Sequence, residues 1–444
     1  MSYDVAVVGL GYVGLTLAVA LADTGFRVLG VEHRKDVVDM TNRGQPHFSE
    51  NGLPEMLAHA VETGHLKAVE ALGADVQADI YVITVGTPLG KDGKARLDFI
   101  EAATSAVAEN MPDGALVILR STVKIGTARN VVAPILEASG KSYQIAMAPE
   151  RTLEGRAMHE LRRLPQIVGA DTPETRERAA HFFYKLTPTA VQVSSLEAAE
   201  IIKLVDNTFR DVQFGFANEV ARICDAFGVN AMEVIPGGKL GYERTNVALP
   251  GLVGGPCLEK DPHILAQSLR DAGVELDITT AARRVNERQP VETVDFILAE
   301  HARRAEGPPR IALLGMAFKG VPATDDLRGA MSLAVLDAIR AKAPGTAVML
   351  FDPVCSGGQL NEAAPGCEVA SHLEEAITGA DVAIIANNHP ELASWRPRQM
   401  LRVMAEGGFI YDYWNHFSDL RPYELGPSYF AVGNTGTRDV RVHG

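Results

Sequence analysis

The feature that most limits how this chain can fold is the glycine-rich segment GLGYVG at residues 9–14. It follows an apolar run at 4–9 that is typical of a buried strand. It also opens a stretch at 13–23 that has helical periodicity. Glycines at this spacing allow a tight turn, a close approach of the backbone to a pyrophosphate, and close packing of helix on strand. The segment therefore predicts the first strand, turn and helix of a parallel α/β sheet.

An acidic residue stands where a dinucleotide site needs one, because Glu32 ends the next predicted strand at 27–32. A carboxylate there accepts hydrogen bonds from ribose hydroxyls and repels a 2′-phosphate, which favours NAD over NADP. The alternative is a chance glycine-rich turn, but strand, helix and acidic residue all follow in the expected order. We predict NAD as cofactor, with contacts from Gly9, Gly11, Tyr12, Val13, Gly14 and Glu32.

Strands and helices alternate in two separate parts of the chain, which implies mostly parallel sheets covered on both faces. The first part continues through predicted strands at 80–85, 116–119 and 145–147 and helices at 98–110 and 127–139. The second part follows Gly307 and contains predicted strands at 311–315, 348–352, 382–386 and 409–412 and a helix at 331–341.

The middle of the chain is helical. A long amphipathic pattern at 195–227 and a second helical region at 262–300 flank a Gly/Pro-rich loop at 236–256. We expect the long helix to link the domains and to offer a dimer surface. The predicted fold has two Rossmann-like doubly wound domains joined by this helix, with an NAD-binding domain at 1–194, a helical central domain at 195–300, and a C-terminal domain at 308–444.

Hydroxyl side chains follow two of the predicted strands. The segment 84–88, TVGTP, follows one strand and places Thr87 at the carboxyl edge of the sheet, where ligands bind in such folds. Thr122 follows another strand and supports the same argument. The alternative for both segments is an ordinary turn from strand to loop. We predict Thr87 as a cofactor contact.

The composition of the 444 residues narrows the class of protein. The net charge of −14 argues against a nucleic-acid partner. The sequence shows no apolar run long enough to span a bilayer and no signal peptide. The four cysteines form no CxxC pair, and neither they nor the 12 histidines have metal-ligand spacing. We expect a cytoplasmic protein with thiols rather than disulfides, no metal, and no membrane partner.

The segment GGPCLEKD at 254–261 is the most informative for chemistry. Two glycines leave Cys257 open to approach, and the nearby Lys260 favours the nucleophilic thiolate. The alternative, a cysteine that is only a small buried hydrophobe, fits Cys224 inside the long helix better. Cys355 and Cys367 lie in loop-like surroundings and are not expected to be catalytic.

Lys203 and Asn207 are four residues apart on the long helix and therefore share one face. Such a pair could donate hydrogen bonds to an alkoxide or a water. The spacing alone leaves open that they form only a solvated edge of the helix.

The chain resembles the UDP-glucose/GDP-mannose dehydrogenase family over nearly its full length. The matching stretches, in order, are GLGYVG at 9–14, PE at 149–150, KLVDN at 203–207, GGPCLEKD at 254–261, AFKGVPATDDLR at 317–328 and YDYW at 411–414. The resemblance implies an N-terminal NAD domain, a helical middle that forms a homodimer or higher homo-oligomer, and a C-terminal domain that holds a UDP-sugar.

The resemblance also implies a four-electron oxidation of the sugar C6 alcohol to a carboxylate, through a thiohemiacetal and a thioester on Cys257. It assigns Lys203 and Asn207 to stabilising an oxyanion, Asp261 and Thr122 to ordering a water or acting as base, and Glu150 to thioester hydrolysis. It adds Arg328 as a cofactor contact. The implied substrate contacts are Glu150, Arg151, Lys203, Asn207, Gly254, Lys319 and, from a partner subunit, Arg244.

Some residues depart from the pattern of UDP-glucose enzymes. Arg151 replaces an aromatic residue that usually follows the PE pair, and the segments 149–155 and 242–246 are more similar to the branch that acts on UDP-N-acetylhexosamines. The sequence does not separate N-acetylglucosamine from N-acetylmannosamine. Residues 329–332, GAMS, replace a usual Ser-Pro, which affects the expected loop shape and not the chemistry.

Three alternatives stay open from the sequence. The chain could be a UDP-glucose 6-dehydrogenase. It could be a two-electron β-hydroxyacid dehydrogenase, which would need no cysteine and would leave the third domain unexplained. It could also be a catalytically silent sensor of NAD or nucleotide sugars, which would have no need of the thiol, lysine, asparagine and aspartate present here.

Overall fold

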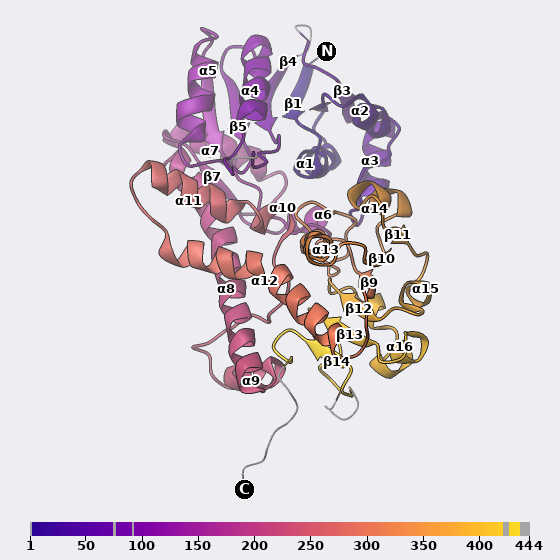
Figure 1. The fold of residues 1–444 in the computed structure, drawn as a ribbon. Helices are drawn as coiled ribbons and strands as arrows, with labels where there is room; N and C mark the ends of the chain where they lie inside the picture. Colours follow the sequence, from indigo (N-terminus) through magenta and orange to yellow (C-terminus); the bar gives the residue numbers. More distant parts are fainter. Residues whose placement is uncertain (1, 74–76, 91–92, 421–425, 436–444) are drawn as a thin grey trace. The chain divides into compact units, whose positions relative to one another are not determined.

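The computed structural model describes residues 2–73, 77–90, 93–420 and 426–435 (Figure 1). The chain divides into two compact units. Unit 1 comprises Met1–Asn207 and His263–Glu275, and unit 2 comprises Thr208–Pro262 and Leu276–Gly444. The three domain ranges expected from the sequence stay a prediction.

Unit 1 is built on an eight-stranded sheet with the order β3-β2-β1-β4-β5-β6-β7-β8. All pairs are parallel except β6 with β7. The strands are β1 (Ser2–Val8), β2 (Val28–Val31), β3 (Leu66–Val69), β4 (Gln77–Ile83), β5 (Ala115–Leu119), β6 (Tyr143–Met147), β7 (Gln166–Gly169) and β8 (Ala190–Val193).

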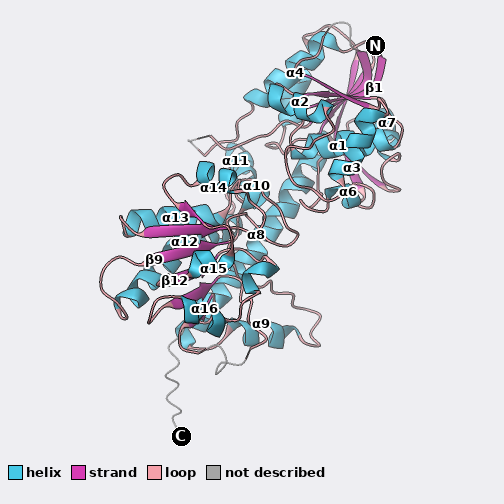
Figure 2. Cartoon of the chain, turned by 90° about the vertical axis from the view of Figure 1, so that its right-hand side faces the viewer, coloured by secondary structure: helices cyan, strands magenta, loops and turns pink. Residues whose placement is uncertain are grey.

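Helices cover both faces of this sheet (Figure 2). They are α1 (Tyr12–Asp23), α2 (Lys35–Asn42), α3 (Leu53–Glu62), α4 (Asp98–Asn110), the π-helical turn η1 (Ala128–Val132), α5 (Ala133–Glu137), α6 (Ala157–Glu160) and α7 (Pro173–Phe183). The helix α11 (Asp261–Asp271) belongs to unit 1 from His263 onward.

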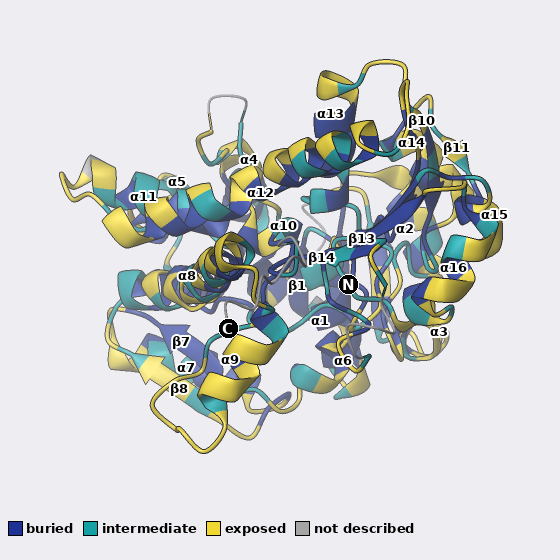
Figure 3. Ribbon diagram, turned by 60° about the horizontal axis from the view of Figure 1, so that its bottom comes forward, coloured by how far each residue is buried: buried dark blue, intermediate teal, exposed yellow. Residues whose placement is uncertain are grey.

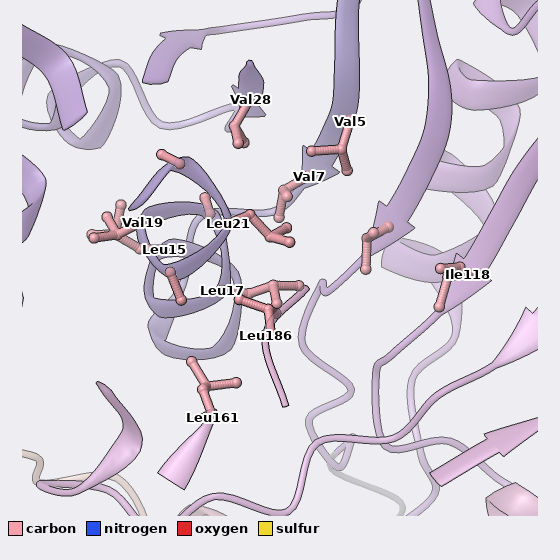
Figure 4. Close-up of a cluster of buried hydrophobic side chains, with 14 of the residues drawn as sticks. Val5, Val7, Leu15, Leu17, Val19, Leu21, Val28, Ile118, Leu161 and Leu186 are labelled. Carbon is pink, nitrogen blue, oxygen red and sulfur yellow. The ribbon is translucent and has the colours of Figure 1, made fainter. Parts of the chain in front are cut away.

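Side chains of β1 alternate between two apolar cores, as the period of a strand requires. Val5 and Val7 pack with α1, α3 and α7, whereas Ala6 and Val8 pack with α4 and α5. Figure 4 shows the first of these cores, where leucines of α1 lie against Val5, Val7 and Val28 of the sheet. Alternation on a strand that is buried on both faces explains why its sequence is almost uniformly apolar.

Unit 2 contains a six-stranded, fully parallel sheet with the order β11-β10-β9-β12-β13-β14. If β9 is taken as the first strand of unit 2, the order is 3-2-1-4-5-6, the same as that of β3-β2-β1-β4-β5-β6 in unit 1. The strands are β9 (Arg310–Leu314), β10 (Ala347–Phe351), β11 (Glu368–Val369), β12 (Val382–Ile385), β13 (Phe409–Asp412) and β14 (Tyr429–Ala431).

The helices of unit 2 again lie on both faces, with α12 and α13 in one core and α15 and α16 in the other. Their bounds are α9 (Ala231–Lys239), α10 (Gly255–Leu258), α12 (Asp277–Ala302), α13 (Met331–Lys342), α14 (Gly357–Ala363), α15 (Leu373–Ile377), the 3-10 turn η2 (Pro390–Ala393) and α16 (Pro397–Val403). The predicted class, two Rossmann-like α/β folds with a helical middle, is confirmed.

The long helix α8 (Leu196–Phe227) has 32 residues and carries the boundary between the two units, after Asn207. Its predicted bounds, 195–227, are nearly those observed. One side of the helix is buried, and the other carries a row of exposed apolar residues, which Figure 3 shows as exposed segments recurring along α8.

Three expectations about helices were wrong in detail. The helical region expected at 262–300 is interrupted between α11 and α12, because Gly273 adopts a left-handed conformation (φ 75°) at the end of α11. The loop expected from residue 236 begins only after α9, which accommodates Pro236 in its second turn. The helix expected at 127–139 starts as the π-helical turn η1 before it becomes α5. The residues from 436, expected to be frayed, lie outside the described residues.

Candidate active site

The turn between β1 and α1 is shaped by its glycines. Gly9 has a positive φ of 95° and donates its N–H to the carbonyl of Val31 at 2.7 Å. A Cβ atom on Gly14 would overlap the carbonyl oxygen of Gly9, so this position tolerates no side chain. A Cβ on Gly11 would meet no protein atom within 4 Å. Space beside the backbone at Gly11 is what a bound pyrophosphate requires.

The start of α1 is suited to an anion. Its N-cap residue is Gly11, which offers no side-chain acceptor to the helix, and the first turn contains no acidic residue. The first N–H groups of a helix lack intrahelical partners and carry a partial positive charge. They are therefore available to phosphate oxygens. The roles of Gly11, Tyr12 and Val13 as cofactor contacts stay a prediction.

Glu32 lies immediately after β2, beside this turn. Its side chain is buried and accepts hydrogen bonds from the backbone N–H of Leu10 at 3.0 Å and of Arg34 at 3.1 Å. These bonds fix the carboxylate at the carboxyl end of the strand. Each oxygen keeps acceptor capacity, which is the requirement for binding ribose hydroxyls.

The hydroxyl residues after β4 and β5 join neighbouring loops. Thr84 donates to the carbonyl of Gly9 at 2.7 Å, and Ser121 donates to that of Val85 at 2.6 Å. The buried hydroxyl of Thr87 donates to the carbonyl of Thr122. The structure thus brings Thr87 and Thr122 together at the carboxyl edge of the sheet. The Thr87 hydroxyl serves this loop contact, so a cofactor contact would come from its remaining acceptor capacity or its backbone.

Tyr12 takes part in a network that the sequence did not reveal. Its hydroxyl donates to the carboxylate of Glu50, and the same carboxylate accepts the N–H groups of Gly155 at 2.7 Å and Ala157 at 2.9 Å. Burial, followed by the contact with Glu50, raises the pKa of Tyr12 well above its usual value. The network ties the start of α1 to the segment after Glu150.

Glu150 is buried and its carboxylate is held on both oxygens. One oxygen accepts from Arg120, and the other accepts from the backbone N–H of Arg151 and of Thr152, each at 2.7 Å. Burial alone would raise the pKa of Glu150, but Arg120, the N–H of Thr152 and the charge of Lys203 together lower it. The carboxylate is therefore ionised near neutral pH. Arg120 is a functional neighbour that the sequence analysis missed.

Lys203 and Asn207 are both buried on α8, so the solvated edge considered from the sequence is excluded. The influence of Lys203 on the pKa of Glu150 places these two charges near each other. Arg151 pairs with Asp206 of the same helix at 3.4 Å, and it donates to the carbonyl of Pro165, just before β7, at 2.6 Å. Within unit 1 the structure thus gathers Glu150, Arg151, Lys203 and Asn207.

Cys257 lies in unit 2, within the short helix α10, and is exposed. The two glycines before it pack tightly. The N–H of Gly255 donates to the carbonyl of Gly329 at 2.7 Å, and a Cβ on Gly255 would overlap the ring of Phe318. The structure therefore brings the cysteine segment against the segment 317–329. Gly254 serves this packing, since a Cβ there would also overlap Gly329.

The residues after the cysteine form a close pair. Lys260 binds the carboxylate of Asp261 at 2.9 Å, and Asp261 is completely buried. The ammonium group of Lys260 therefore forms an ion pair with Asp261. Asp261 is the first residue of α11.

The remaining predicted contacts lie on loops of unit 2. Lys319 is half-buried, and its amine lies 5.2 Å from the ring centre of Phe318. Arg328 is exposed and forms a bidentate pair with Asp326, with a shortest distance of 2.5 Å. Arg244 stacks on the ring of Tyr242 in the exposed segment after α9. Their roles toward ligands stay predictions.

Two of the other three cysteines are poor nucleophiles. Cys224 and Cys355 are buried, and burial raises the pKa of both thiols. Cys367 is half-buried and accepts from Arg340 at 3.4 Å. In the part of the chain that the structure describes, no group of three or more His, Cys, Asp or Glu residues could hold a metal ion.

Comparison with known proteins agrees with this arrangement. Residues 3–187 match the NAD binding domain of the UDP-glucose/GDP-mannose dehydrogenase family, residues 197–288 its central domain, and residues 312–419 its UDP binding domain. The chain belongs to this family. It is an NAD-dependent nucleotide-sugar dehydrogenase.

Individual relatives of this dehydrogenase are similar along most of their length. UDP-N-acetyl-D-mannosamine dehydrogenase from Pyrococcus horikoshii is 34% identical over 399 residues, which cover 88% of this chain and 90% of the relative. The solved structure of that P. horikoshii enzyme aligns with a TM-score of 0.86 at 31% identity, covering 98% of this chain and 100% of its own. A UDP-glucose dehydrogenase structure from Pyrobaculum islandicum aligns with a TM-score of 0.85 at 27% identity and covers 98% of both chains.

Within residues 2–73, 77–90, 93–420 and 426–435, no helix of this dehydrogenase is both long enough and apolar enough to cross a bilayer.

Proposed function

We propose that the enzyme oxidises the C6 alcohol of a UDP-N-acetylhexosamine, either UDP-N-acetylglucosamine or UDP-N-acetylmannosamine, to the uronic acid through a covalent intermediate on Cys257. The observation that carries the proposal is the contrast between the exposed Cys257 in a glycine-lined loop and the buried Cys224 and Cys355. The named activity of the P. horikoshii relative supports the choice of an N-acetylated sugar.

The cofactor site fits NAD by the space at Gly11, the uncapped start of α1 and the fixed carboxylate of Glu32. When bound, NAD accepts one hydride in each of the two oxidations. The overall reaction consumes the alcohol, two NAD and one water, and yields the carboxylate, two NADH and three protons. We assign the cofactor contacts to Gly9, Gly11, Tyr12, Val13, Gly14, Glu32, Thr87 and Arg328.

In the first oxidation, the C6 hydroxyl must lose a proton. We assign Asp261, with Thr122, to hold the water or act as the base that receives this proton. Lys203 and Asn207 would donate hydrogen bonds to the oxygen as negative charge develops on it, which lowers the barrier most when the donors are already fixed by burial.

Cys257 acts after the aldehyde has formed. Its sulfur attacks the carbonyl carbon, and the carbonyl oxygen becomes the oxyanion that Lys203 and Asn207 stabilise. Loss of the second hydride leaves a thioester. Water then adds to the thioester carbon and the thiolate leaves, which regenerates the enzyme.

Glu150 is assigned to the hydrolytic step. Its lowered pKa means that it is ionised near neutral pH and can hold a water as a hydrogen-bond acceptor. Arg151, Gly254 and Lys319 are assigned to binding the UDP-sugar together with Glu150, Lys203 and Asn207. Arg244 is assigned to the substrate site of a partner subunit.

We also propose a cytoplasmic homodimer, or a higher homo-oligomer, formed through α8. Large apolar side chains on this helix are exposed at spacings of four and seven residues, which puts them on one face. The most exposed are Phe209 at 59%, Phe216 at 54%, Ile223 at 53% and Phe227 at 79%. Light scattering would test this assembly: Phe216→Glu should give monomers, and a wild-type monomer would contradict it.

The substrate assignment is tested by supplying UDP-N-acetylglucosamine, UDP-N-acetylmannosamine, UDP-glucose and GDP-mannose separately and identifying the sugar product by mass. A uronic acid from one of the N-acetylated sugars is expected. Acid formation only from UDP-glucose would support the second candidate, which the P. islandicum structure favours. No acid from any of the four, with NAD still bound, would contradict the proposal.

A further inference from the structure

The side chain of Arg283, on α12 in unit 2, is almost completely buried, and its guanidinium binds the segment that carries Cys257. One terminal nitrogen donates to the carbonyl of Leu258 at 2.8 Å, and the other donates to the carbonyl of Val253 at 3.0 Å. These two carbonyls lie on either side of Cys257. One side chain on α12 therefore holds the nucleophile's loop at both of its ends.

Arg283 is itself held by α8. The nitrogen that binds Leu258 also donates to the carboxylate of Asp211 at 2.6 Å, and both residues are almost completely buried. Asn286, one turn further along α12, donates to the same carboxylate at 2.9 Å. The guanidinium therefore connects α8, α12 and the cysteine loop through hydrogen bonds of fixed direction.

A second contact aligns the approach to this loop. Asn218 of α8 both donates to and accepts from the backbone of Gly251, at 3.0 and 2.9 Å, and it binds Asn286 at 2.9 Å. The polar network therefore follows the backbone from Gly251 to Leu258. Such a network gives a loop one defined geometry, which an apolar contact would not.

The chemistry of this contact is specific to arginine. Burying an ion pair costs desolvation free energy, so apolar residues of similar size could pack there at no loss of stability. A planar guanidinium can donate in several fixed directions at once, whereas the lysine ammonium is a point charge on a flexible stem. The three acceptors around Arg283 use this property.

We propose that Arg283, anchored by Asp211, is a positioning residue for the second oxidation, because it fixes the backbone on both sides of Cys257. The proposal rests on the role of Cys257 given above. The first oxidation does not use the thiol. Displacing the loop should therefore impair acid formation more than aldehyde formation, which a loss of general stability would not do.

The variant Arg283→Lys tests this role, since it keeps the charge beside Asp211 but cannot reach all three acceptors. The neighbouring exposed residue provides the matched control, Arg284→Lys. We expect kcat for acid formation to fall about 100-fold in Arg283→Lys, in line with a small displacement of a catalytic group, with little change in KM for the sugar. NADH per sugar consumed should fall from two toward one, and a hydrazine reagent should trap the aldehyde. The control should behave like the wild type.

If Arg283→Lys still forms two NADH per sugar consumed, whatever its rate, the proposal is overturned. If that variant fails to fold by circular dichroism, the double variant Asp211→Asn/Arg283→Met removes both charges together and is assayed in the same way. A ratio near one in this variant supports the role, and a ratio of two overturns it.

Hydrogen exchange separates this proposal from the assignment of Cys257. Amides of residues 253–258 should exchange at least 10-fold faster in Arg283→Lys than in Arg284→Lys. If wild type and Cys257→Ser make acid equally well, the assignment of Cys257 fails, and Arg283 as a positioning residue for the thiol fails with it. If Cys257 is required but exchange at 253–258 is unchanged, only the positioning role is overturned.

Discussion

Two glycine turns, one in each unit, have the same pattern of hydrogen bonds but are followed by different structural elements. Gly9 donates to the carbonyl at the end of β2, and Gly315 donates to the carbonyl at the end of β10, each at 2.7 Å. Both have a positive φ, 95° and 83°. The next residue in each turn donates to an acidic side chain, Leu10 to Glu32 and Met316 to Asp352.

The two turns also differ in the use of the acidic residue. In unit 1 the helix α1 begins at once, whereas in unit 2 the helix α13 begins only at Met331. Asp352 accepts four backbone N–H groups, and Glu32 accepts two. The same turn therefore leads directly to a helix N-terminus suited to an anion in one unit, and in the other to a long segment that packs against the cysteine loop. The start of the following helix, and not the turn itself, decides the function.

Gly14→Ala should have the largest effect. The new Cβ would overlap backbone at Gly9, which cannot move without opening the turn, so we expect unit 1 to lose about 3 kcal/mol or more of its free energy of unfolding. Gly11→Ala is the matched control, since its Cβ meets no protein atom; stability should change by less than about 1 kcal/mol while NAD affinity falls. Urea unfolding followed by circular dichroism measures the first effect and NAD titration the second. Equal stability of the two variants would contradict the role given to Gly14.

Asp352→Ala should act on unit 2 alone. It leaves the N–H groups of Met316, Ala317, Val354 and Cys355 without their acceptor, at a cost of about 3 kcal/mol. Both tryptophans of the chain, Trp395 and Trp414, belong to unit 2, so their fluorescence reports its unfolding.

The corresponding variant in unit 1 is Glu32→Ala, which should weaken NAD binding about 10-fold or more, because it removes a charged acceptor for the ribose. If Asp352→Ala lowered NAD affinity as much as Glu32→Ala does, the claim that only the turn in unit 1 serves cofactor binding would be contradicted.

Unit 1 should also depend on pH through Glu200 on α8. Burial raises the pKa of Glu200 to about 7, although its carboxylate accepts the N–H groups of Gly126 and Ala128. The folded state therefore holds this proton at pH values where the unfolded chain has released it. The contribution of Glu200 to the free energy of unfolding is greatest below the pKa of the unfolded chain. It is lost as the pH rises to about 7, and the loss amounts to about 3 kcal/mol at most.

The pH dependence is measured as the free energy of unfolding between pH 4.5 and 8 in the wild type and in Glu200→Gln. The variant should flatten the part of the profile that falls toward neutral pH. Identical profiles for the two proteins would show that Glu200 does not titrate as proposed.

Arg328→Met should have the smallest effect on stability. The side chain of Arg328 is 64% exposed, and an ion pair whose cation is open to solvent contributes about 1 kcal/mol or less. If Arg328 contacts the cofactor as assigned, KM for NAD should rise while Tm stays within about 2 °C. A Tm that falls without any change in KM would reverse the assignment.

Sequence patterns predicted the features that depend on local periodicity. The turn at 9–14 was found from the spacing of its glycines, and the helix at 195–227 was found because its apolar residues recur at helical spacing. The strands β3, β7, β8, β11 and β14 were missed. Each has four residues or fewer, which leaves little room for a recurring apolar pattern. The break at Gly273 was overlooked although a glycine was present to signal it.

Buried charged residues were the main omission at the site. Glu50, Arg120 and Arg283 each look like surface residues in the sequence, since charged side chains are seldom buried. Their partners lie far along the chain, as with Glu50 and Gly155, which are 105 residues apart. Only the folded structure shows such contacts. The exposed cysteine was found because the glycines beside it leave a local pattern.

The covalent four-electron mechanism is tested most directly by counting NADH formed per sugar consumed, in the wild type and in Cys257→Ser with the accepted UDP-sugar. We expect two NADH per sugar and a uronic acid for the wild type. We expect almost no acid for the variant, with NAD affinity unchanged. One NADH per sugar in the wild type, or acid formation by Cys257→Ser at the wild-type rate, would contradict the mechanism.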